Sequence, residues 1–301
     1  MPTQALFGQL LIGLINGAFY ALLSLGLSVI FGLLNIINFA HGAQYMLGAF
    51  AAYFLLQWAG LGYWTALVVA PVVVGLIGIV LAPIVVGITG IIIERLFLQW
   101  LYKLDHLYGL LLTFGLALIF EGTFRNFFGS SGLPYSVPPE LQGGRNLGFM
   151  FLPNYRAWVV VFSLAVCLTT WFVIERTKLG SYLRAATENP TLVRAFGINV
   201  PRMITLTYGF GVALAALAGV MAAPIYNVSP QMGANLIIVV FAVVVIGGMG
   251  SIMGAIVTGF GLGIIEGLTK VFFPEASNTV IFIIMAIVLL IRPAGLFGRA
   301  T

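Results

Sequence analysis

The chain has 301 residues, of which 61% are hydrophobic and only 7% are charged. An ordinary globular chain is roughly 45–50% apolar and about 25% charged, so this chain has too few charged side chains to cover a water-soluble domain. Its net charge of +5 comes from residues scattered between apolar runs, which excludes the continuous basic face that nucleic acid requires. The composition predicts an integral membrane protein in contact with lipid.

Apolar runs separated by charges and turn residues recur along the whole sequence. Helices are favoured, because lipid offers backbone groups no hydrogen-bonding partners and the alternation of an outer-membrane barrel is absent. At about 20 apolar residues per crossing, we predict an all-α, polytopic membrane protein of about eight helices, forming a single domain over residues 1–301. The expected runs are 7–34, 37–57, 64–93, 107–124, 157–174, 204–225, 235–268 and 277–291.

Two of these runs are too long for one simple crossing and predict broken or re-entrant helices. The run 64–93 contains Pro71 and Pro83, each of which bends or breaks a helix. The run 235–268 is interrupted by a cluster of glycines, which we expect to form a turn and to let helices pack closely. Broken helices at membrane depth are typical of transporters. The glycines of this turn are Gly247, Gly248, Gly250 and Gly254.

The charged residues cluster, and this clustering predicts the topology. Residues 175–203 form the most charged loop, which the excess of Lys and Arg in cytoplasmic loops places in the cytoplasm. Counting crossings puts the loop 94–105 on the same side, and the tail with Arg292 and Arg299 too if 235–268 is a hairpin. Nine of the 13 Lys and Arg residues then lie inside, and Met1 lies outside.

The cytoplasmic loop contains signals for a short helix. Asn189 reads as an N-cap with Pro190 at the first helical position, and Gly197 reads as the helix stop. Such a helix would expose Leu192, Val193 and Phe196 for docking into a groove of another protein. The alternative is a solvated connector that only maintains the topology.

Three segments in order resemble the branched-chain amino acid family of ABC importer permeases. They are residues 31–42, residues 184–198 and residues 247–255, and the similarity covers nearly the whole chain. The length is similar to that of the shorter, LivH-like member of the paired permeases. The resemblance implies the ABC importer permease fold and coupling to the ATPase through Arg184, Asn189, Pro190, Ala195 and Gly197.

The same resemblance implies location and partners. It implies a multi-pass protein of the bacterial inner membrane that pairs with a homologous second permease, usually a longer one, in a heterodimer. It also implies two ABC ATPase subunits and a periplasmic solute-binding protein. The expected solutes are branched-chain or related small amino acids, with urea and short amides as alternatives within the family.

A set of polar residues recurs every three positions near the start of the chain. On a helix, Asn35, Asn38, His41 and Gln44 would spiral across half of the surface. They are candidates to line the translocation path and to bind a passing carboxylate or ammonium group. The alternative is that they form hydrogen bonds between helices, worth about 1 kcal/mol each.

Two carboxylates, Glu121 and Glu266, lie near the ends of apolar runs. Each is followed four residues later by a base, Arg125 and Lys270 respectively, which favours structural ion pairs. The alternative is that one of them carries protons, as in a proton-coupled carrier for a small polar solute. An ATP-independent channel is a further alternative of the same kind.

No catalytic, metal or cofactor site is predicted. Cys167 is the only cysteine, and the two histidines, His41 and His106, are far apart in the sequence. No Gly-Lys pair occurs, so the lysine of a phosphate-binding loop is missing. An intramembrane hydrolase ranks behind the transport alternatives, because no nucleophile motif surrounds any serine. We therefore expect a transport subunit driven by separate ATPases, not an enzyme.

Overall fold

The computed structural model describes residues 3–34, 38–76, 107–148 and 150–298. Five helices in these ranges are long and apolar enough to cross a membrane, so the predicted helical membrane protein is confirmed. The helices are α1 (Thr3–Leu34), α2 (His41–Ala59), an unlabelled helix Tyr63–Leu76, α5 (Leu107–Phe128), α6 (Asn154–Arg176), α7 (Lys178–Glu188), α8 (Pro190–Ala195), α9 (Val200–Tyr226), α10 (Met232–Gly247), α11 (Ile252–Phe272) and α12 (Val280–Ile291).

The helices follow the apolar runs expected from the sequence. The run 235–268 divides into α10 and α11 at the predicted glycine turn. The helix Tyr63–Leu76 continues through Pro71, so this proline does not break it. The second predicted break, at Pro83, lies outside the described residues, and so do the charged loop 94–105 and Arg299.

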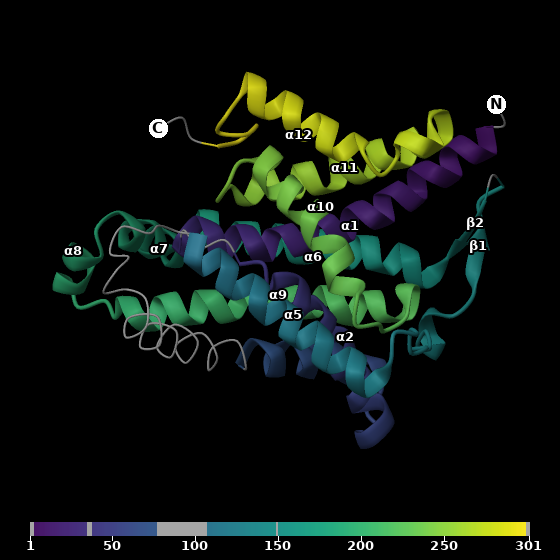
Figure 1. Cartoon of the computed structure of the whole chain (residues 1–301), viewed down its shortest axis with the longest axis horizontal. Coiled ribbons are helices and arrows are strands. Elements are labelled where there is room, and N and C mark those ends of the chain that lie inside the picture. Colours follow the sequence, from purple (N-terminus) through teal and green to yellow (C-terminus); the bar gives the residue numbers. More distant parts are fainter. Residues whose placement is uncertain (1–2, 35–37, 77–106, 149, 299–301) are drawn as a thin grey trace.

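The segment between α5 and α6 departs from the all-helical prediction. It contains a short 3-10 turn, Pro139–Leu141, followed by β1 (Gly144–Asn146) paired antiparallel with β2 (Phe151–Pro153). This β-ribbon lies at one end of the molecule, and α7 and α8 lie at the opposite end (Figure 1). We call these the β-ribbon end and the α7–α8 end.

Helix α1 is the central element, since it packs against α6, α9, α10 and α11. Its contact with α11 is made by glycines on both helices. A Cβ atom added to Gly13 would lie 2.4 Å from the carbonyl oxygen of Gly263, and one added to Gly267 would lie 2.4 Å from the carbonyl oxygen of Gln9. Glycines at four-residue spacing in α11, Gly259, Gly263 and Gly267, therefore let its backbone approach that of α1 closely.

A second close contact joins α2 to α9. A Cβ atom on Gly219 would lie 1.9 Å from the carbonyl oxygen of Tyr45, and one on Gly48 would lie 2.2 Å from that of Ala216. Backbone atoms cannot move aside as a flexible side chain can. These two helices therefore require glycine where they cross.

The C-terminal tail meets the turn between α10 and α11. The amide of Leu296 donates to the carbonyl of Ile246 (2.8 Å), and the amide of Phe297 donates to that of Gly247 (3.1 Å). Gly32, near the end of α1, lies against Gly250 of the same turn. Segments 248–251 and 292–298 thus share one end, as expected for a hairpin.

We predict that Gly219→Val lowers the stability of the fold strongly. The added side chain would meet backbone of α2, so the cost should reach at least about 3 kcal/mol, the upper part of the usual range for overpacking. Gly261→Val is the matched control, because no atom lies within 4 Å of a Cβ at that position. Fluorescence-detected size exclusion after heating measures both variants; equal melting midpoints would contradict the packing described.

Candidate coupling segment and polar sites

Helix α7 is attached closely to the end of α6. A Cβ atom on Gly180 would lie 1.6 Å from the carbonyl oxygen of Ile174. Arg184 donates to that carbonyl (3.2 Å) and contacts the carboxylate of Glu175 (3.4 Å). A basic side chain at the carboxyl end of a helix satisfies carbonyls that have no partner within it. Arg184 therefore fixes α7 to α6, which the sequence pattern did not predict.

The predicted signals for α8 are confirmed. The Asn189 side chain accepts from the amide of Leu192 (3.0 Å), Pro190 occupies the first turn, and Gly197 has φ = +82°. Leu192 and Phe196 are exposed at 54% and 76% of their surface. The side chain of Ala195 is exposed as well.

The prediction that Val193 is exposed is wrong. Its side chain is 6% exposed and packs in a small cluster with Ala186 and Val200. The reason is that α8 folds back between α7 and α9, so one face of this short helix must be buried. The exposed apolar surface of α8 is therefore formed by Leu192 and Phe196.

The glycine turn joins α10 and α11 through two residues with positive φ. Gly248 has φ = +99° and Gly250 has φ = +83°, a backbone conformation that favours glycine. Ser251 caps α11 by accepting from the amide of Gly254 (3.0 Å). A Cβ atom on Gly254 would lie 2.1 Å from the Gly247 carbonyl oxygen, so this residue permits the close antiparallel approach of the two helices.

The polar set near the start of the chain does not lie on one helix. Asn38 precedes α2, which begins at His41, and Asn35 lies outside the described residues. The predicted spiral is wrong because the chain turns between α1 and α2, where the amide of His41 donates to the carbonyl of Asn38 (3.3 Å). Of the members that the structure describes, only His41 and Gln44 share a helical turn.

The three described members of this set form a buried network with Tyr208 of α9. The hydroxyl of Tyr208 accepts from the side-chain amides of Asn38 and Gln44, each at 3.3 Å. His41 Nδ1 lies 3.2 Å from Gln44 Oε1, and its Nε2 donates to the carbonyl of Leu23 (3.0 Å). No spacing pattern in the sequence points to Tyr208, because its partners Asn38 and Gln44 lie far from it along the chain.

This network joins α1, α2 and α9. Asn38 and His41 are at most 1% exposed and Gln44 is 8% exposed. Their geometry supports the hydrogen-bonding alternative. A role in the translocation path stays a prediction.

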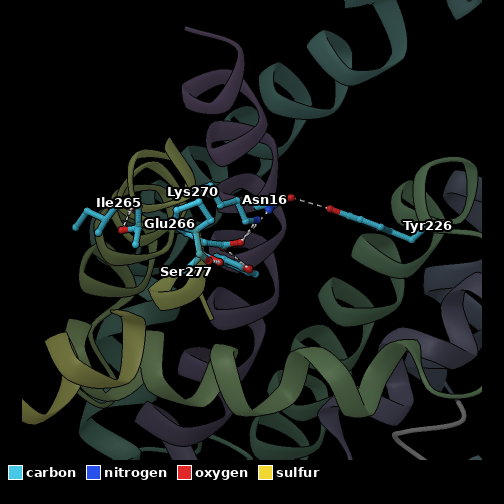
Figure 2. A network of polar contacts seen from close by, with 9 residues as sticks. Asn16, Tyr226, Ile265, Glu266, Lys270 and Ser277 are labelled. Atoms are coloured by element: carbon cyan, nitrogen blue, oxygen red, sulfur yellow. Dashed lines mark hydrogen bonds and ion pairs between the residues drawn. The ribbon is translucent and has the colours of Figure 1, made fainter. Parts of the chain in front are cut away.

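A second polar network joins α1 to α11 and α9 nearer the β-ribbon end. Glu266 is 6% exposed and forms the predicted ion pair with Lys270. Its carboxylate also accepts from the hydroxyl of Tyr20 (2.7 Å) and from the amide of Asn16 (3.4 Å). Figure 2 shows Asn16 between Glu266 and Tyr226, whose hydroxyl donates to Asn16 Oδ1 (2.8 Å).

Sequence spacing identified the pair Glu266 and Lys270 but missed their partners on α1. Asn16 and Tyr20 are four residues apart, one helical turn, and this spacing of polar residues in an apolar run was the available signal. Glu121 forms its predicted pair with Arg125 at 3.4 Å, partly exposed.

Two cavities are lined in part by residues of both α2 and α10. One, of about 260 Å³, is almost entirely apolar and has Phe39, Phe114 and Ile237 in its walls, with Glu121 among its lining residues. The other, of about 340 Å³, includes Asn16, Tyr20 and Tyr226 of the network above. The two helices touch at Gly42 and Gly233, where a Cβ on Gly233 would lie 2.0 Å from the Gly42 carbonyl oxygen.

Comparison with known proteins gives matches over almost the whole chain. Residues 9–289 match the family model described as branched-chain amino acid transport system / permease component. The chain is 30% identical to the high-affinity branched-chain amino acid transport system permease protein LivH of Escherichia coli (strain K12), with 97% of this chain and 95% of the relative covered.

Two further relatives support the match. The corresponding permease protein BraD of Pseudomonas aeruginosa is 30% identical, over 97% of this chain and 95% of the relative. The permease protein LivM of Escherichia coli (strain K12) is 27% identical, over 92% of this chain and 67% of the relative. No solved structure gives a significant match.

We predict that Tyr208→Phe destabilises the junction of α1, α2 and α9. The change leaves the buried amide donors of Asn38 and Gln44 without their acceptor, at a cost of about 1–3 kcal/mol. Thermal unfolding of the purified chain measures the loss. Tyr53→Phe is the matched control, because Tyr53 is partly exposed. Equal stability of Tyr208→Phe and the unchanged chain would rule out the network as drawn.

Proposed function

Because the chain belongs to the branched-chain amino acid transport system permease component family, we propose that it carries branched-chain amino acids across the bacterial inner membrane. The chain is a multi-pass permease subunit of the ABC importer type. The observation that carries the substrate proposal is the match over 97% of the chain to two permease proteins whose names specify branched-chain amino acids.

Energy for transport must come from other subunits in this proposal. The sequence contains no Gly-Lys pair, so it has no lysine for a phosphate-binding loop. The proposed partners are two ABC ATPase subunits, a periplasmic binding protein and a second, homologous permease. The similarity to LivM, a longer permease protein, supports a heterodimer.

The segment α7–α8 is the proposed contact with the ATPases. Its exposed Leu192 and Phe196 offer apolar side chains to a groove of the partner. The Arg184 contacts and the close approach at Gly180 connect α7 rigidly to α6. Because α7 also contacts α1 and α9, a displacement of this segment would reach three of the membrane helices.

The first test measures uptake of radiolabelled leucine by cells of the native host, with and without the gene for this chain. We expect loss of high-affinity uptake on deletion and recovery with the unchanged chain. Uptake should persist in the presence of a protonophore while cellular ATP is maintained. Uptake that stops with the protonophore, and that Glu121→Gln or Glu266→Gln abolishes, would instead support a proton-coupled carrier.

The second test concerns Gly197, which ends α8 with φ = +82°. Gly197→Val cannot adopt this conformation without strain and should uncouple transport, so that uptake falls while membrane insertion is normal. Gly197→Asn is the matched variant, because asparagine tolerates the left-handed region, and it should retain most of the uptake. ATP hydrolysis and uptake are measured together in the reconstituted transporter. Normal uptake by Gly197→Val would remove the coupling role from this turn.

A further inference from the structure

The cavity of about 340 Å³ has both apolar and polar walls and lies between α1, α2, α9 and α10. Its volume falls in the range of small-molecule sites, about 300–1,000 Å³. None of its lining residues is charged. Such a mixture suits a ligand that has an aliphatic part and a compact polar part. The residues that carry the argument are Phe19, Met232, Leu236, Tyr20, Tyr45 and Tyr226.

Two of the tyrosines can only accept hydrogen bonds from a ligand. The hydroxyl of Tyr20 donates to the carboxylate of Glu266 (2.7 Å), and that of Tyr226 donates to Asn16 Oδ1 (2.8 Å). A phenol has one hydrogen, so each oxygen keeps only its acceptor capacity. The buried carboxylate of Glu266 lies directly behind Tyr20. Lys270 pairs with this carboxylate, so what this side of the cavity offers is two hydrogen-bond acceptors, which suit a donor group of the ligand such as an ammonium.

Tyr45 differs from these two tyrosines. Its side chain is completely buried, and within the described part of the chain its hydroxyl has no hydrogen-bond partner. A buried hydroxyl without a partner is costly for the fold. Because Tyr45 lines the cavity, a ligand that accepts a hydrogen bond there would satisfy it.

We propose that this cavity binds one aliphatic α-amino acid during transport. The ammonium group donates to the oxygens of Tyr20 and Tyr226, and the carboxylate accepts from Tyr45. The aliphatic side chain contacts Phe19, Met232 and Leu236. This inference rests on the proposed function, because it takes the solute to be an amino acid.

The test measures binding of tritium-labelled leucine to the full chain, purified with its partner permease, for the unchanged protein and Tyr45→Phe. The substitution removes only a hydroxyl without a partner, so the melting midpoint should not fall. The affinity for leucine should fall about tenfold or more, as expected for a hydrogen bond to a charged group. Two leucine analogues then compete with the labelled leucine. Isocaproate lacks the ammonium group, so it should compete less strongly in Tyr45→Phe than in the unchanged protein, by the same factor as leucine. Isoamylamine lacks the carboxylate, so it should compete equally in both proteins.

Tyr135→Phe is the matched control, because the Tyr135 hydroxyl is also buried without a partner in the described ranges but lines neither cavity. Its leucine affinity should equal that of the unchanged protein. The proposal is overturned if Tyr45→Phe binds leucine normally, or if the substitution weakens competition by isoamylamine by the same factor as the affinity for leucine. If Tyr45→Phe does not fold, Leu236→Ala replaces it, since Leu236 is only partly buried and is assigned to the aliphatic side chain of the ligand; unchanged leucine affinity then overturns the proposal.

The two proposals fail in different ways. If the unchanged protein supports leucine uptake but Tyr45→Phe binds leucine normally, the proposed function stands and only this binding site is contradicted. An unchanged protein that neither transports nor binds leucine contradicts the proposed function itself.

Discussion

The whole structure depends on helices that approach until their backbones touch. Glycines allow this between α1 and α11, between α2 and α9, and between α2 and α10. Within lipid, apolar side chains gain little by leaving one apolar environment for another, so close packing and hydrogen bonds must hold helices together. The Tyr208 and Glu266 networks supply such hydrogen bonds at α1. Rigid contacts of this kind let a displacement of one helix move its neighbours.

The same packing divides the molecule into functional regions. The exposed apolar residues of α8, the glycine turn and the C-terminal tail lie toward the α7–α8 end (Figure 1). The two cavities are lined in part by α2 and α10, which cross at Gly42 and Gly233. In the proposed mechanism, motion that begins at α8 passes through Arg184 and α6 to the helices that line these cavities.

Local signals predicted well where one or two residues determine the structure. The Asn189 cap, the Gly197 stop, the glycine turn and the two acid–base pairs could all be predicted, because capping and helical spacing act within a few residues. The burial of Val193 could not, because it depends on how α8 folds against α7 and α9. The Tyr208 and Tyr20 contacts also escaped prediction, since they join residues distant in sequence.

The central claim is that the α7–α8 segment transmits ATP-driven motion to the membrane helices. Spin labels at Tyr182→Cys in this segment and at Met249→Cys in the glycine turn test it directly, since both positions are exposed and the native Cys167 is buried. Pulsed electron resonance on the reconstituted transporter should give a distance distribution that shifts when ATP is bound by a hydrolysis-deficient ATPase. The control is that the labelled transporter takes up leucine normally with its active ATPase. If the distance distribution in that transporter does not change when ATP is bound, the α7–α8 segment does not transmit the motion.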